Sequence, residues 1–206
     1  MTITPTSTVS LCPTPACTNP QGVQYAFYTD YYYATAVDQY KTDPPTATGV
    51  ASTLGLSGDC FVQDNVDIYG TPEECHAFGL NYRGYLYSAV SGAFTFEVTG
   101  ADDYVTIWAG EVAYSGWNYD NTLIDTNYQV VGSGVSASVT VAAGTYLPFR
   151  IVYAQGDGPF TLGVSITAPD NSVVLSSSST SNPDVVQYSC DGVTAPPFAE
   201  PFGAET

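Results

Sequence analysis

Two adjacent acids, Asp102 and Asp103, are the residues of this chain whose type and spacing best fit a chemical role. They stand between two apolar stretches, residues 93–98 and 104–109, so we expect them at a corner between two strands. Successive side chains of an extended chain point to opposite faces, so both carboxylates reach one ion only if the backbone bends sharply, for example at a non-proline cis peptide bond. Carboxylate oxygens suit a hard divalent cation such as Ca²⁺. A solvated turn is the alternative, because Asp is favoured in turns.

The overall composition favours strands and turns. The chain of 206 residues contains 17 Tyr, 19 Gly and 14 Pro, but only one Met and three Lys and Arg together, so common helix formers are scarce. The length suits one large β domain or two small ones and is sufficient for a substantial core. We therefore predict an all-β fold, a single antiparallel β-sandwich with long loops and disulfide-tied termini.

The net charge of −17 restricts the possible partners. Nucleic acids and anionic membrane surfaces attract positive charge, so neither is an expected partner of this chain. No run of 18 or more apolar residues occurs, so we expect no membrane insertion by this domain. The charge is compatible with cation binding, and the basic residues are limited to Lys41, Arg83 and Arg150.

The five cysteines predict disulfide bonds. None forms a C-x-x-C motif and the chain has a single His, so a zinc site is not expected. A bridge between Cys60 and Cys75 would stiffen a polar segment that has little core of its own. We expect Cys190 to tie the C-terminal segment to Cys12 or Cys17. One cysteine is then left over, either as a free thiol or in an intermolecular bridge.

The chain divides into three parts. Residues 1–21 predict an irregular N-terminal arm, residues 22–175 the β-sandwich, and residues 176–206 a C-terminal segment that returns to the domain and begins a linker. Alternating apolar and polar residues on both sides of Ser91-Gly92 predict a strand, a tight turn and a strand. Two segments without such periodicity, residues 42–65 and 111–122, predict loops. Further strands are expected within residues 22–33, 129–131, 135–141, 146–154, 160–167 and 173–175.

Three segments in a fixed order carry a family resemblance. They are G-V-Q-Y-A from residue 22, the stretch Y-R-G-Y-L-Y through A-D-D-Y-V-T-I-W-A-G at residues 82–110, and A-A-G-T-Y-L-P-F-R-I-V-Y-A-Q-G-D-G-P-F-T-L at residues 142–162. In this order the chain resembles, over nearly its whole length, the PA14/GLEYA adhesin domain of fungal cell-wall proteins. That group includes flocculins, epithelial adhesins and a chitin-end adhesin. The resemblance implies a β-sandwich of PA14 topology, outside the cell, at the cell wall or cell surface.

The resemblance also implies a Ca²⁺ site. It makes Asp102 and Asp103 a cis-peptide pair of calcium ligands, joined by a side-chain oxygen and two backbone carbonyls from a later loop. The side-chain position, usually Asn in the family, is Gln155 here, and the carbonyls are those of Asp157 and Pro159. Gln places its amide oxygen one methylene further out, so either the loop relaxes inward or the Asp157 carboxylate replaces it.

A calcium-dependent lectin is the function that this resemblance implies, with a terminal sugar completing the coordination of the ion. The partners are then glycans on cell surfaces or cell-wall polysaccharide. Trp117 would supply an apolar face on which a pyranose stacks, although it could instead belong to the core. The choice among mannose, galactose and N-acetylglucosamine would rest on the loops that carry the remaining candidate residues, Trp117, Asn118, Asp120, Gly156, Asp157, Gly158 and Pro159.

Two other classes of function compete with the lectin. In one, the domain is structural or self-associating, its tyrosines form the contact surface, and calcium only makes it more rigid. In the other it is a glycoside hydrolase, which needs two carboxylates separated by roughly 5–9.5 Å. No set of acids in the sequence marks a buried proton donor opposite a nucleophile, so we do not expect an enzyme. Loss of glycan binding with a chelator separates the lectin from the structural domain.

Overall fold

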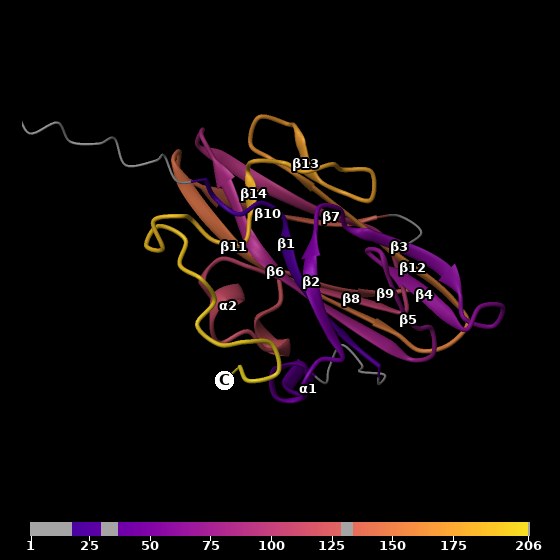
Figure 1. Ribbon diagram of the computed structural model, residues 1–206. Helices are drawn as coiled ribbons and strands as arrows, with labels where there is room; N and C mark the ends of the chain where they lie inside the picture. Colours follow the sequence, from indigo (N-terminus) through magenta and orange to yellow (C-terminus); the bar gives the residue numbers. More distant parts are fainter. Residues whose placement is uncertain (1–17, 30–36, 129–133, 206) are drawn as a thin grey trace, which may run out of the picture.

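The protein is a sandwich of two antiparallel β-sheets (Figure 1). A computed structural model describes residues 18–29, 37–128 and 134–205. The larger sheet contains β2 (Ala47–Ala51), β1 (Val23–Tyr28), β6 (Phe78–Ser88), β11 (Thr145–Gln155), β8 (Tyr104–Ala109) and β9 (Ile124–Asn127) in this order, and β14 (Val185–Val186) pairs with β6. The smaller sheet contains β10 (Val135–Val141), β7 (Gly92–Asp102), β12 (Pro159–Thr167) and β13 (Val173–Leu175), and β3 (Gly55–Asp59) pairs with β12.

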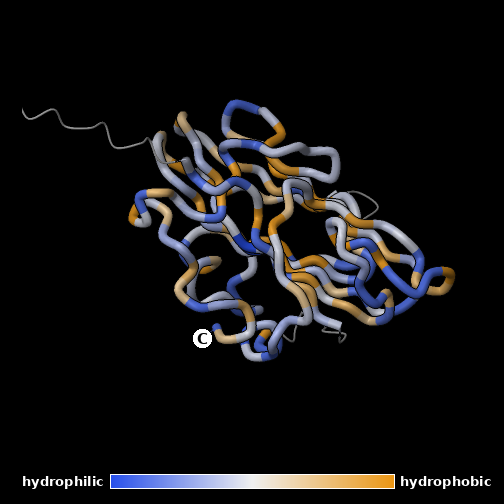
Figure 2. The backbone as a smooth tube through the Cα atoms, viewed as in Figure 1, coloured by the Kyte–Doolittle hydropathy of each residue, from blue (hydrophilic) through white to orange (hydrophobic). Residues whose placement is uncertain are grey.

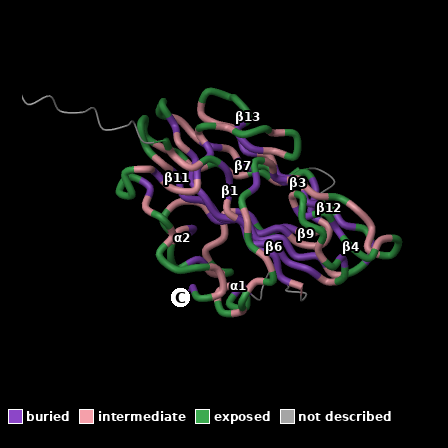
Figure 3. The backbone as a smooth tube through the Cα atoms, viewed as in Figure 1, coloured by how far each residue is buried: buried purple, intermediate pink, exposed green. Residues whose placement is uncertain are grey.

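Alternation of side chains builds the core between the sheets. On β7, Phe94, Phe96 and Val98 are buried while the residues between them are more exposed, as expected for a strand with one face on the core. Phe96 meets Phe149 of the larger sheet with ring centroids 6.3 Å apart. The purple tubes in Figure 3 run through the middle of the molecule, where this core lies.

The outer face of the larger sheet is covered as well. β6 and β11 are buried along nearly their whole length, which requires a second layer on the side away from the smaller sheet. Two short helices, α1 (Val37–Thr42) and α2 (Glu111–Tyr114), contribute to that layer together with the C-terminal segment (Figure 1). Trp108 and Trp117 pack edge to face within it, with centroids 5.2 Å apart. This face of the sheet is therefore a second, smaller core.

The predicted all-β sandwich is confirmed, and the strands with clear alternation occur where they were expected. The loop predicted at residues 42–65 is wrong, because β2 and β3 both lie within it. Few side chains of β2 and β3 are buried, and the two strands are held by backbone pairing to β1 and β12. Their sequences therefore show no alternation of apolar and polar residues from which the strands could be predicted. Residues 111–122 contain α2 and a 3₁₀ turn at Tyr119–Asn121 rather than only loop. The strand predicted at residues 129–131 lies outside the described residues.

The predicted disulfide between Cys60 and Cys75 is present. It closes a segment that contains a small hairpin, β4 (Asn65–Ile68) and β5 (Thr71–Glu74). Cys190 is also disulfide-bonded, and the two cysteines predicted as its partners, Cys12 and Cys17, lie outside the described residues. Within the described part of the chain, no helix has the length and apolar character needed to cross a membrane.

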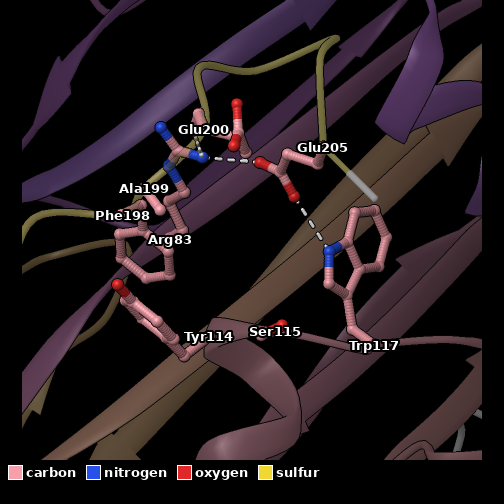
Figure 4. A pocket seen from close by; sticks show the side chains of 8 residues that line it. All are labelled: Arg83, Tyr114, Ser115, Trp117, Phe198, Ala199, Glu200 and Glu205. Carbon is pink, nitrogen blue, oxygen red and sulfur yellow. Dashed lines mark hydrogen bonds and ion pairs between the residues drawn. The ribbon is translucent and has the colours of Figure 1, made fainter.

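Two of the three basic residues of the chain share one buried carboxylate. Arg83 on β6 lies directly opposite Arg150 on β11, and Glu205 bridges them with contacts of 2.5 and 2.8 Å. The Trp117 indole donates to the same carboxylate at 2.9 Å (Figure 4). Lys41 lies over the Trp117 ring, 5.2 Å from its centroid. Burial lowers the pKa of Arg150 to about 10, and the charge of Glu205 opposes that shift. The C-terminal segment thus supplies the charge that two facing arginines need.

Glu205→Gln is expected to destabilise the protein by about 3–5 kcal/mol, since it leaves two buried guanidinium groups without a compensating charge. Urea unfolding at neutral pH measures the change. Glu200→Gln is the matched control, because Glu200 is exposed and touches Arg83 through its backbone carbonyl. An equal effect of the two substitutions would show that the Glu205 charge does not stabilise the arginine pair.

Candidate functional site

The two acids occupy the corner between the sheets. Asp102 ends β7, Asp103 leads into β8, and the peptide bond between them is cis. The backbone of Asp103 is fixed on both sides, because its N–H donates to the Ala154 carbonyl at 3.2 Å and its carbonyl accepts from Tyr128 at 3.0 Å. The corner is therefore tied to the end of β11 and to the residue that follows β9.

The loop after β11 meets the acid pair directly. Pairing of β11 with β8 places Ala154 opposite Tyr104, which brings Gly156 beside Asp103. The Gly156 N–H donates to Asp103 Oδ2 at 2.6 Å. Two predicted parts of the site, the Asp pair and the loop at residues 155–159, are thus brought together although more than 50 residues separate them.

The carboxylates repel each other. Partial burial raises the pKa of Asp102, and the charge of Asp103 and a hydrogen bond between the two acids raise it further. Removing a carboxylate from water and placing it beside a like charge both disfavour ionisation. A cation shared by the two acids would relieve both effects. The donor set of two adjacent carboxylates therefore fits a hard divalent ion.

Tyr153 supports the corner from inside the core. Its hydroxyl donates to the Asp102 carbonyl oxygen and lies 3.4 Å from the Gln155 amide oxygen. Burial, followed by the charges of the two acids, raises the pKa of Tyr153, so the hydroxyl stays protonated and remains a donor. This residue was not singled out from the sequence, where one tyrosine among 17 carries no signal.

Gln155 is fully buried and faces its own loop. Its Nε2 lies 3.4 Å from the carbonyl oxygens of both Gly158 and Pro159, while its Oε1 faces the Tyr153 hydroxyl. The longer side chain, compared with Asn, thus reaches across the turn and braces it. The Pro159 carbonyl predicted as a ligand is one of the oxygens that Gln155 contacts.

The Asp157 carboxylate contacts Gly158 and His76 and not the Asp pair. It accepts from the Gly158 N–H at 3.1 Å and lies 3.3 Å from His76 Nδ1. In the described ranges, no group of three or more His, Cys, Asp or Glu side chains is placed to hold a metal ion. The suggestion that the Asp157 carboxylate joins the pair as a third acid therefore finds no support in its contacts.

The prediction that Trp117 stacks against a sugar is wrong. Trp117 is 1% exposed, packed on Trp108 and bonded to Glu205, so it offers no ring face to a ligand. Asn118 and Asp120 cap and form the 3₁₀ turn beside it. The Trp108 indole N–H donates a hydrogen bond to the Asn118 carbonyl. Trp108 follows Asp103 by five residues, which in an extended strand separates their α-carbons by about 16 Å. Trp117, Asn118 and Asp120 are therefore at the opposite end of β8 from the acid pair.

Comparison with known proteins identifies the domain. Residues 78–168, which include the Asp pair and the loop after β11, match the GLEYA domain. This chain carries a GLEYA domain. It is 31% identical over 189 residues to "Putative cell agglutination protein pfl4" of Schizosaccharomyces pombe, covering 75% of this chain and 31% of the relative. It is 26% identical over 121 residues to the flocculation protein FLO9 of Saccharomyces cerevisiae, covering 53% of this chain and 9% of that protein. The chain spans less than a third of the curated relatives it matches.

Solved structures show the same fold. The A domain of epithelial adhesin 9 from Candida glabrata, in complex with Galβ1-4GlcNAc, has a TM-score of 0.58 and 16% identity, covering 80% of this chain and 90% of that chain. The PA14 domain of the MpAFP antifreeze protein has a TM-score of 0.56 and 16% identity, covering 86% and 95%. The PA14 fold that the sequence resemblance implied is thereby confirmed.

Gln155→Leu is expected to destabilise the GLEYA domain by about 1–3 kcal/mol, because it removes the buried amide that contacts Tyr153, Gly158 and Pro159. Urea unfolding measures the change in the free energy of unfolding, and a chelator in the buffer keeps a bound ion from contributing to it. Gln39→Leu is the control, since Gln39 is exposed on α1. A cost for Gln155→Leu no larger than that for Gln39→Leu would contradict the bracing role of Gln155.

Proposed function

We propose that this GLEYA domain is a calcium-dependent lectin of a fungal cell-surface adhesin. The observation that carries the proposal is the adjacent pair Asp102-Asp103, whose carboxylates interact with each other while Asp103 accepts a hydrogen bond from Gly156 in the loop after β11. Such a pair supplies two of the oxygen ligands that Ca²⁺ prefers. Binding rather than catalysis is proposed, because the acids sit side by side instead of facing each other across a substrate.

The residues of the site have separable tasks in this proposal. Asp102 and Asp103 hold the ion, and the carbonyl oxygens of Asp157 and Pro159 complete the protein side of the shell. Gln155 and Tyr153 hold this loop and this corner in place from below, through the contacts described above. The bound ion would supply positive charge for two neighbouring hydroxyl groups of a sugar.

The sugars bound in related structures indicate which ligands to test first. The epithelial adhesin 9 and 6 domains were solved with Galβ1-4GlcNAc and Galβ1-3GlcNAc, so terminal galactosides are the first ligands to test. A glycan array in calcium buffer decides among galactose, mannose and N-acetylglucosamine. Names of relatives, a cell agglutination protein and a flocculation protein, support a location at the cell wall or cell surface.

Asp102→Asn and Asp103→Asn are each expected to weaken calcium binding more than about 100-fold, or about 2.7 kcal/mol, and to remove glycan binding with it. Removal of a formal charge weakens a hard-cation site directly, while the core lies in the flanking strands. Titration calorimetry with Ca²⁺ and then with the tightest array glycan measures both steps. Asp120→Asn is the matched control, an exposed acid in the 3₁₀ turn far from the pair. Wild-type affinity in either Asp pair variant would refute the site.

A chelator is expected to abolish glycan binding without unfolding the domain, and added Ca²⁺ to restore it. The large cores on both faces of the main sheet do not depend on the ion. Circular dichroism monitors the fold and the glycan array the binding. Glycan binding that persists in chelator would contradict the calcium-dependent lectin, and an array without any binding in calcium would favour a structural or self-associating domain.

A further inference from the structure

The loop that begins at the Cys60–Cys75 disulfide carries two apolar side chains in solvent. Phe61 is 72% exposed and Val62 is 80% exposed. Figure 2 shows the tip of this loop in the hydrophobic colour, projecting at the end of the molecule opposite α1 and the C-terminal segment. An exposed phenylalanine has no structural benefit by itself, since burial of such a ring is favourable by about 1.5–3 kcal/mol. Its position on the molecule is therefore informative.

Hydrogen bonds and a disulfide hold the loop against the proposed site. Backbone hydrogen bonds join Cys60 N to the Gly158 carbonyl at 2.8 Å and Ala77 N to the Gly156 carbonyl at 2.9 Å, on either side of the disulfide. Asp59 closes the tip, because its Oδ1 accepts from the Phe61 N–H at 2.9 Å. The two ends of the disulfide-closed segment thus both rest on the loop that contacts Asp103.

The Phe61 ring lies directly over Gly158. A Cβ atom added at Gly158 would lie 2.5 Å from a carbon of that ring, so only a glycine permits this contact. Gly156, two residues earlier, donates to Asp103 Oδ2. The α-carbons of Gly156 and Gly158 are at most about 7 Å apart, so the ring stands at the margin of the acid pair, within reach of a ligand held there.

We propose that Phe61 is the aromatic platform for the sugar, with its ring packed against the apolar C–H face of a pyranose whose hydroxyl groups are held at the Asp pair. This inference rests on the proposed lectin function and deepens it. Lectin sites combine a few polar anchors with an apolar surface, and the buried Trp117 does not provide that surface. An aromatic ring supplies it, because its face packs on C–H groups while the sugar hydroxyls point elsewhere.

Titration calorimetry tests the platform with methyl glycosides of galactose, mannose and N-acetylglucosamine, using whichever the parent protein binds most tightly. Phe61→Ala is expected to weaken sugar binding at least tenfold while leaving the calcium affinity within twofold of the parent. Phe61→Trp is expected to keep sugar binding, because the larger ring preserves the apolar face. Val62→Ala, an equally exposed change one residue away, is expected to alter the sugar affinity less than twofold.

Tryptophan fluorescence is a second measurement, and it reports contact between residue 61 and the sugar. The native tryptophans Trp108 and Trp117 are buried, so Phe61→Trp adds an exposed fluorophore at the proposed platform. Its emission is expected to shift to shorter wavelength when the sugar is added with Ca²⁺, and the parent emission to stay unchanged. If the parent binds a sugar but Phe61→Ala binds it equally well, the platform is overturned and the lectin stands. If the parent binds no glycan at all, the lectin fails and the platform with it.

Discussion

The register of β11 is the constraint on which both charged clusters of this protein depend, the arginine pair with Glu205 and the pair Asp102-Asp103. β11 pairs with β6 along its whole length of 11 residues and with β8 on its other side. A slip of one residue would turn every side chain of β11 to the opposite face of the sheet. It would separate Arg150 from Arg83 and Glu205 in the middle of the strand, and Gly156 from Asp103 just beyond its C-terminal end.

The two clusters handle charge in opposite ways. In the middle of β11, Arg83 and Arg150 share the buried carboxylate of Glu205, and that contact holds the C-terminal segment on the sheet, while Lys41 pairs with Asp38. Beyond the C-terminal end of β11, two carboxylates stand together without a basic partner among the described residues, so the charge of a cation is the compensation that they lack.

The proposed binding surface is built from loops that rigid strands hold in place. The strands β8, β11 and β12 fix the positions of the Asp pair and of the loop at residues 155–159. The disulfide-closed segment places the Phe61 ring against Gly158. Exposed loops on a fixed scaffold are the usual place for recognition, since the scaffold can bear the cost of ordering them. The apolar ring and the acid pair then lie next to each other although they come from distant parts of the chain.

Local pattern in the sequence determined several strands and the corner that holds the acids. β8, β10 and β13 occur at the residues predicted, and Asp102 and Asp103 lie between two strands, because apolar patterning and turn chemistry are local properties. Family resemblance added the loop at residues 155–159 to the same site. Tertiary structure alone decided the rest. β2 and β3 form by pairing with distant strands, Trp117 is buried because Arg150 and Glu205 lie against it, and Phe61 is exposed beside Gly158 because a disulfide and two backbone bonds carry its loop there. Each of these depends on which distant segment packs nearby, and neither residue type nor spacing along the chain encodes that neighbour.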